Sequence, residues 1–93
     1  IQSFDPNPYP VKFAGEVSDF DASEYIDRKE VKRTDRYSQF AIAASVQAMR
    51  EAGLEKDSAS IDPDMFGVII GSGIGGISTF EEQHGRFIEK GPD

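Results

Sequence analysis

The pattern of apolar and polar positions along the chain predicts two long helices. Residues 37–52 are rich in alanine, contain no glycine and are followed by Gly53, which is typical of a helix of about four or five turns that ends at a left-handed residue. Its small side chains lie on several sides, so we expect this helix to be buried between layers. From residue 77 onward apolar side chains again recur at helical spacing, which predicts a second helix that Gly91 and Pro92 stop.

Two further segments have the pattern of strands. Residues 65–71 form a continuous apolar run rich in β-branched side chains, which is typical of a strand covered on both faces. Residues 11–17 alternate apolar with small or polar side chains, as a short edge strand or extended stretch does. One or two strands cannot satisfy their own edge groups as a sheet. The sequence therefore predicts an α/β fold in which this chain is one piece of a larger layered structure.

The residues before the first long helix are expected to contain little regular structure. Prolines at positions 6, 8 and 10 remove backbone donors and favour an extended arm. Asp21 and Glu24 have the spacing of a capping box, in which the two side chains bond the free amides of a helix start. A short helix is expected to begin there.

Composition limits the class of protein. The 93 residues suffice for at most one domain, and an apolar content of 38% is too high for a disordered acidic tail. No apolar run approaches the roughly 18 residues of a membrane span, and the first residues lack the basic start and apolar stretch of a signal peptide. We therefore expect a cytoplasmic protein without membrane contact.

The candidate chemistry is limited by the residue types that the chain contains. It has no cysteine, which excludes a disulfide framework, a thiolate zinc site and a cysteine nucleophile within these residues. The single histidine, His84, lies one turn after Glu81, and a metal site on this pair needs ligands from elsewhere. A histidine on a polar helix face is the favoured interpretation, and we expect neither a metal nor a cofactor.

A glycine loop, residues 71–76, links the second predicted strand to the last helix. Such a junction can bind phosphate, but the loop lacks the Gly-Lys-Ser/Thr of a P-loop, and the acidic residue of a dinucleotide site falls at residues 91–93 without a second strand before it. Glycines that permit tight turns or close packing are therefore favoured. Ile74 has a glycine on either side, and by spacing alone it is expected to fold onto the core, with a role in lining an apolar pocket as the alternative.

A basic segment, residues 28–36, interrupts an otherwise acidic chain. The formal net charge is -7, yet this segment contains five basic and two acidic side chains. Lys29, Lys32 and Arg33 are spaced to project from one face of a helix, which suits an acidic or phosphorylated partner. A solvated helix face is the alternative, and these residues alone leave both open. Nucleic acid fits less well, because the segment is short and lacks interleaved aromatic side chains.

Three stretches of the chain, taken in order, resemble one protein family. They are residues 12–17 with 19–21, residues 27–36, and residues 67–76 with 81–84. In order and spacing they resemble the elongating β-ketoacyl-acyl-carrier-protein synthases of type II fatty-acid synthesis, the long-chain-accepting second subclass in particular. The resemblance covers nearly the whole chain.

This resemblance implies a thiolase-like fold with a layered α-β-α-β-α architecture that works as a homodimer. Residues 1–93 would then be a fragment of its N-terminal domain, with the nucleophilic cysteine after Asp93 and two catalytic histidines and a lysine later still. The implied activity is decarboxylative Claisen condensation of an acyl group with malonyl-carrier protein. His84 matches a non-catalytic family position. Because the thiolate that carries the acyl group is missing, we expect the 93-residue chain alone to be inactive.

The resemblance also implies two binding roles and no catalytic residue within the chain. Lys29, Lys32 and Arg33 match positions that contact the acyl carrier protein. Gly73 and Ile74 match the acyl-pocket loop, in which the isoleucine gates the fatty chain. Two alternatives stay open: a stand-alone acidic α/β binding module that presents the basic segment to a phosphate-bearing partner, and a fragment of a polyketide-type ketosynthase.

Overall fold

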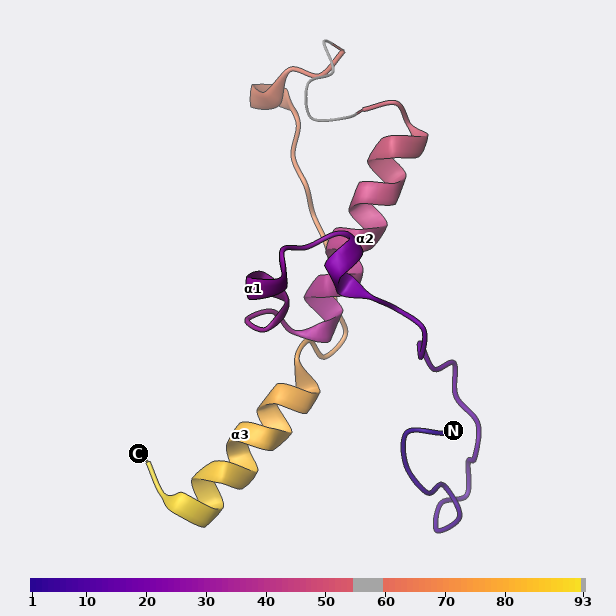
Figure 1. Ribbon diagram of the computed structural model, residues 1–93, viewed down its shortest axis with the longest axis vertical. Helices are drawn as coiled ribbons and strands as arrows, with labels where there is room; N and C mark the ends of the chain where they lie inside the picture. Colours follow the sequence, from indigo (N-terminus) through magenta and orange to yellow (C-terminus); the bar gives the residue numbers. More distant parts are fainter. Residues whose placement is uncertain (55–59, 93) are drawn as a thin grey trace.

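The computed structural model describes residues 1–54 and 60–92 as helices joined by long irregular segments (Figure 1). In chain order the elements are the 3-10 helix η1 (Ala22–Glu24), the α-helices α1 (Arg28–Val31) and α2 (Arg36–Glu51), the 3-10 helix η2 (Pro63–Met65) and the α-helix α3 (Ile77–Lys90). η1 contacts both α1 and α2. α3 begins near the N-terminal end of α2 and projects away from it (Figure 1).

The two long helices predicted from the sequence are confirmed as α2 and α3. The last turn of α2 is followed by Gly53, which has a φ of 69°. Glycine adopts this left-handed backbone without the steric cost that a Cβ atom brings. α3 ends before Gly91, whose N–H donates to the carbonyl of Phe87 at 2.9 Å. Both helices therefore end at a glycine with positive φ, as the sequence predicts.

The predicted short helix at Asp21 is a single 3-10 turn. The Asp21 carboxylate accepts hydrogen bonds from the backbone N–H of Ser23 at 3.0 Å and from the Ser23 hydroxyl at 2.7 Å. These donors, the hydroxyl first, hold the pKa of Asp21 below its usual value. Asp21 thus caps η1 through its second neighbour along the chain.

The α/β prediction, with its partial thiolase-like layer, is wrong for this chain. Among residues 1–54 and 60–92 no segment pairs with another as a strand. Phe66, within the predicted strand 65–71, does have extended backbone, with φ -118° and ψ 116°. A strand is defined by hydrogen bonds to a neighbouring strand, and neither this segment nor residues 11–17 has one in the described part of the chain. The apolar pattern indicates side chains suited to a strand, but the backbone hydrogen bonds of a strand require a second strand beside it.

The expectation that the first long helix is buried between layers is also wrong. Of the residues that the structure describes, only Ala22 on η1 and Ala43 and Gln39 on α2 are buried. The radius of gyration is 17.9 Å. A compact domain of this length has about 12 Å. The chain is therefore open, with a small packed centre where η1 crosses α2.

Arg36, the first residue of α2, connects α2 to the chain before η1 within this centre. Its guanidinium carbon lies 5.1 Å from the ring centroid of Phe20 and 5.0 Å from that of Phe40. The two rings are themselves 5.0 Å apart. The guanidinium also donates to the backbone carbonyls of Val17 at 3.3 Å and Phe20 at 3.5 Å. A cation held against two rings while it bonds the chain before η1 fixes that chain to α2.

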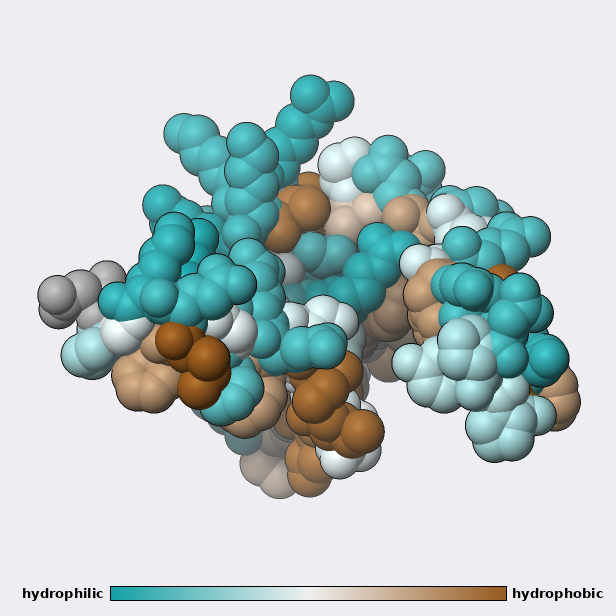
Figure 2. Space-filling view, turned by 90° about the horizontal axis from the view of Figure 1, so that it is seen from below, coloured by the Kyte–Doolittle hydropathy of each residue, from teal (hydrophilic) through white to brown (hydrophobic). Residues whose placement is uncertain are grey.

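Large apolar side chains remain at the surface of the described chain. Along the predicted strand, Val68 is 71% exposed and Ile69 100% exposed, and on α3 Phe80 is 67% exposed. Figure 2 shows such apolar side chains in brown between polar ones in teal. Consecutive large apolar side chains left exposed, as at residues 68–70, are typical of a surface that contacts another molecule or segment. None of the helices in the described residues has the length and apolar character that a membrane crossing requires.

The arm before η1 closes on itself through Glu16. Its carboxylate accepts from the Ser3 hydroxyl at 2.6 Å and from the backbone N–H groups of Gln2 at 2.6 Å and Ser3 at 3.1 Å. These donors, the Ser3 hydroxyl first, lower the pKa of Glu16 below its ordinary value of 4.5. The ionised carboxylate is therefore the form that holds the loop closed.

Replacing Arg36 with alanine should loosen η1. The N–H groups of Tyr25 and Ile26 both donate to the Ala22 carbonyl at 3.0 Å. Loss of the cation that lies against the two rings should make these two amides exchange with deuterium roughly fivefold faster, as measured by NMR. Arg50→Ala, near the other end of the same helix, is the matched control. Equal changes in both variants would show that the ring contacts do not hold η1.

Acidification should open the arm. Because the pKa of Glu16 is lowered in the closed arm, closure is favoured above about pH 4.5 and is lost as the pH falls through the lower pKa. An NMR titration of the Gln2 and Ser3 amides should follow this transition, and Glu16→Gln should remove it. Ser3→Ala should return the pKa toward 4.5, and an unchanged midpoint would contradict the assignment.

Candidate functional site

The basic segment begins with α1 and keeps helical geometry for a few residues after it. Lys29 lies within α1. Lys32 directly follows the last residue of α1 and has φ -71° and ψ -16°. The N–H of Arg33 donates to the carbonyl of Glu30 at 3.0 Å. The three predicted partner-binding residues thus lie on one turn and its continuation, and all three are exposed.

Gln39 of α2 holds the backbone of this turn in place. The residue is 7% exposed, and its amide nitrogen donates to the carbonyls of Val31 and Thr34, both at 3.0 Å. The Thr34 hydroxyl donates to the carbonyl of Glu30 at 2.7 Å. The bond to Val31 satisfies a carbonyl that the end of α1 leaves without a helical partner. Sequence reasoning missed Gln39, because a polar residue inside a helical pattern carries no sign of the groups it bonds.

The cationic ends of the three side chains are available to a partner. In residues 1–54 and 60–92, Lys29, Lys32 and Arg33 form no ion pair or side-chain hydrogen bond. Arg28 differs, because its charge contributes, after the hydrogen bonds from Ser23, to the lowered pKa of Asp21. Exposed cations act over a Debye length of about 8 Å at physiological ionic strength. The arrangement can therefore attract an anionic surface.

The glycine loop, residues 71–76, is closed by one side chain. The Ser72 hydroxyl oxygen accepts from the N–H of Gly75 at 2.9 Å, and Gly75 has a φ of 75°. Ile74 is 76% exposed, so the expectation that it folds onto the core is wrong for the described chain. A Cβ atom at Gly73 would meet nothing within 4 Å. Gly73 and Ile74 thus lie on an open loop that presents one large apolar side chain.

The two predicted binding regions meet at the same end of α2. The basic segment leads directly into α2, and the glycine loop returns to its first turn (Figure 1). There the Tyr37 ring lies 3.7 Å from where a Cβ atom of Gly75 would be. The Thr79 hydroxyl, in the first turn of α3, donates to the Asp35 carboxylate. Segments about forty residues apart in sequence are joined at this point, and no pattern of residues indicates that contact.

His84 lies against an apolar neighbour rather than on the polar face expected for it. Its ring stacks on that of Phe80, with centroids 6.0 Å apart and 5° between the ring planes. Within the part of the chain that the structure describes, no group of three His, Cys, Asp or Glu side chains is placed to hold a metal ion.

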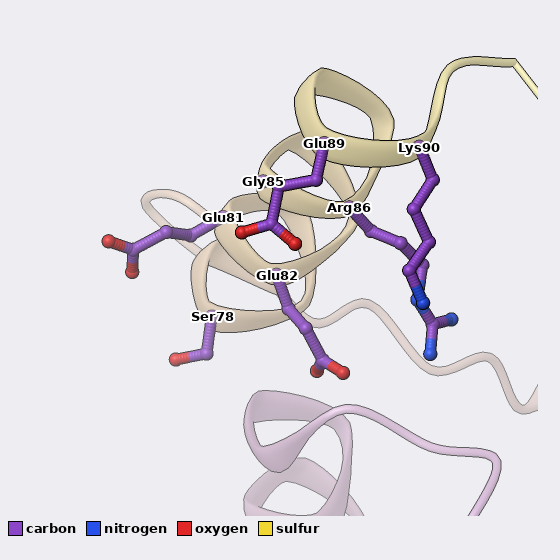
Figure 3. Close-up of a pocket in the computed structure, with 7 residues that line it drawn as sticks. All are labelled: Ser78, Glu81, Glu82, Gly85, Arg86, Glu89 and Lys90. Carbon is purple, nitrogen blue, oxygen red and sulfur yellow. The ribbon is translucent and has the colours of Figure 1, made fainter.

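The polar face of α3 carries an open depression (Figure 3). The lining residues are Ser78, Glu81, Glu82, Gly85, Arg86, Glu89 and Lys90. Figure 3 shows the cationic ends of Arg86 and Lys90 side by side, whereas Glu81 points away from them. All of these residues come from one exposed helix face, which is the composition of a solvated surface. Neither predicted binding region includes this depression.

Comparison with known proteins gives the class to which the chain belongs. The model of the β-ketoacyl synthase N-terminal domain family matches residues 4–91. The chain belongs to this family, as its sequence motifs implied.

Individual relatives narrow the comparison. The chain is 45% identical over 92 residues to 3-oxoacyl-[acyl-carrier-protein] synthase 2 of Synechocystis sp. and 44% identical over 92 residues to the protein of that name from Staphylococcus aureus. Each alignment covers 99% of this chain and 22% of the relative. The chain thus spans about a fifth of the length of the curated relatives it matches. No solved structure matches it.

Proposed function

We propose that this chain forms part of the N-terminal domain of a 3-oxoacyl-[acyl-carrier-protein] synthase. The parent enzyme lengthens fatty acyl chains by decarboxylative Claisen condensation with malonyl-carrier protein. The observation that carries the proposal is the 44–45% identity over 92 residues to two relatives with that name. The exposed apolar side chains support it, since a segment that packs against further parts of an enzyme needs such a surface.

Within this proposal the basic segment contacts the acyl carrier protein. Lys29, Lys32 and Arg33 present three exposed cations from a turn whose backbone Gln39 and Thr34 hold. A backbone that is fixed before binding loses less conformational freedom on binding, and cations on it speed the approach of an acidic partner. The phosphate that links the phosphopantetheine arm to its carrier adds a further anionic group for these cations.

The glycine loop contributes to the acyl pocket in the same proposal. Ile74 offers an apolar side chain that is 76% exposed in the described chain, and Gly73 leaves open space beside it. An acyl chain that covers this side chain removes apolar surface of both partners from water, at about 25 cal/mol per Å². Ile74 is therefore placed to respond to the length of the acyl chain.

The covalent chemistry belongs to residues outside these 93, which contain no cysteine. A cysteine thiolate of the parent takes the acyl group and releases the carrier thiol. Malonyl-carrier protein then loses carbon dioxide, and the resulting carbanion attacks the acyl thioester and expels the thiolate. Two histidines stabilise the oxyanion that develops. A homodimeric, cytoplasmic parent without a cofactor completes the proposal.

Reversing charges in the basic segment should slow carrier association. In the full-length parent, the Lys29→Glu and Arg33→Glu double variant should lower the association rate for acyl carrier protein roughly tenfold or more at low salt, with a smaller effect at high salt. Stopped-flow fluorescence measures the rate. Arg50→Glu with Lys90→Glu is the control, because it changes the net charge equally at other exposed positions. Identical association rates for both double variants would show that the basic segment does not contact the carrier protein.

The purified 93-residue chain should not condense acyl and malonyl carrier substrates, because it has no thiolate to hold the acyl group. The full-length parent should form the 3-oxoacyl product and release carbon dioxide, both detected by mass spectrometry. Product formation by the 93-residue chain, or an inactive parent that only binds phosphate-bearing partners, would contradict the proposed function.

A further inference from the structure

Asp35 occupies the position of a helix cap but does not act as one. It directly precedes α2 with φ -68° and ψ 155°, and its side chain forms no capping hydrogen bond to the helix. An aspartate there usually bonds the free amides of the first turn. Here the carboxylate instead accepts from the hydroxyl of Thr79, 44 residues later in the chain. The Asp35 carboxylate therefore bonds α3 and not the first turn of α2.

Gly76 leaves the space that the carboxylate fills. A Cβ atom on Gly76 would lie 2.6 Å from Cγ of Asp35 and still closer to Oδ2. The φ of Gly76 is -81°, which any residue adopts, so glycine is needed here for space and not for backbone freedom. A methyl group at this position would displace the carboxylate.

Two further features favour the same contact. The first turn of α3 contains no acidic residue, so Asp35 brings a negative charge to a helix N-terminus from a distant part of the chain. The Tyr37 ring lies against Gly75, the residue before Gly76. Asp35 is half-buried, whereas Thr79 is exposed. Acid, ring and two glycines thus form one junction between α2 and α3.

We propose that Asp35 is a positioning residue that fixes the glycine loop to the start of α2 through Thr79 and Gly76. Ile74 lies two residues before Gly76, so the anchor sets where that side chain stands. Asp35 also follows Thr34, whose carbonyl accepts from Gln39. The anchor therefore connects the loop to the segment that carries the exposed cations. Its consequence for acyl-chain selection rests on the proposed function.

Hydrogen exchange in the full-length parent tests the anchor without any assay of activity. Thr79→Val removes the hydroxyl at an exposed site, and amides of residues 72–80 should then exchange roughly tenfold faster, as expected for a lost hydrogen bond to a charged group. Asp35→Ala and Gly76→Ala should have the same effect by removing or displacing the acceptor. Ser78→Ala, the neighbouring exposed hydroxyl, should leave exchange unchanged, and Thr79→Ser should retain wild-type exchange.

A double-mutant cycle separates this bond from general loosening. Adding Thr79→Val to Asp35→Ala should produce no further increase in exchange, because the bond is already lost. Additive effects, or equal effects of Thr79→Val and Ser78→Ala, would overturn the anchor. Should Asp35→Ala fail to fold, Thr79→Val against Thr79→Ser decides the question.

Kinetics test the consequence for acyl selection. In a parent that condenses, Thr79→Val should change the ratio of kcat/KM between long and short acyl substrates by roughly three- to tenfold, with KM for malonyl-carrier protein unchanged. An unchanged ratio in an active enzyme would show that the anchor does not position Ile74. A wild-type parent that does not condense contradicts the proposed function, and the exchange data then still confirm or overturn the anchor itself.

Discussion

The packed centre of the structure depends on the guanidinium of Arg36, which lies against the rings of both Phe20 and Phe40. This contact joins α2 to the chain that precedes η1, and the three buried residues of the described chain lie on η1 and α2. Arg36 is also the last residue of the basic segment. The same side chain therefore contributes to the packed centre and to the charge of that segment. The position of the three free cations relative to α2 depends as well on Gln39, which bonds the carbonyls of Val31 and Thr34.

What the sequence could predict was local. The alanine-rich run before Gly53 and the stop at Gly91 involve neighbours in sequence, and both helices form as expected. The strands were predicted from side-chain pattern alone, whereas a strand requires hydrogen bonds to a partner that residues 1–54 and 60–92 do not supply. The layered fold was therefore wrong for this chain although the family was right.

The candidate site divides in the same way. Charge and spacing make Lys29, Lys32 and Arg33 candidates for partner binding, whereas the role of Ile74 in an acyl pocket is predicted only from the family resemblance. The residues that hold these segments in place, Gln39 and Asp35, were not found. Each forms a hydrogen bond with a residue that no sequence pattern links to it, and for Asp35 that residue is 44 positions away. Composition thus indicates which groups can bind, and three-dimensional packing decides which of them are fixed.

The extended run 66–71 has a consequence for the behaviour of the polypeptide in concentrated solution. It is uncharged, lacks proline and, in the described part of the chain, its amides have no backbone partner. Such a run is a template for β-pairing between copies, of the kind that begins aggregation. The net charge of -7 on the whole chain opposes that encounter by mutual repulsion, so added salt weakens the protection. Colloidal stability of the free polypeptide therefore depends on charge carried by other segments.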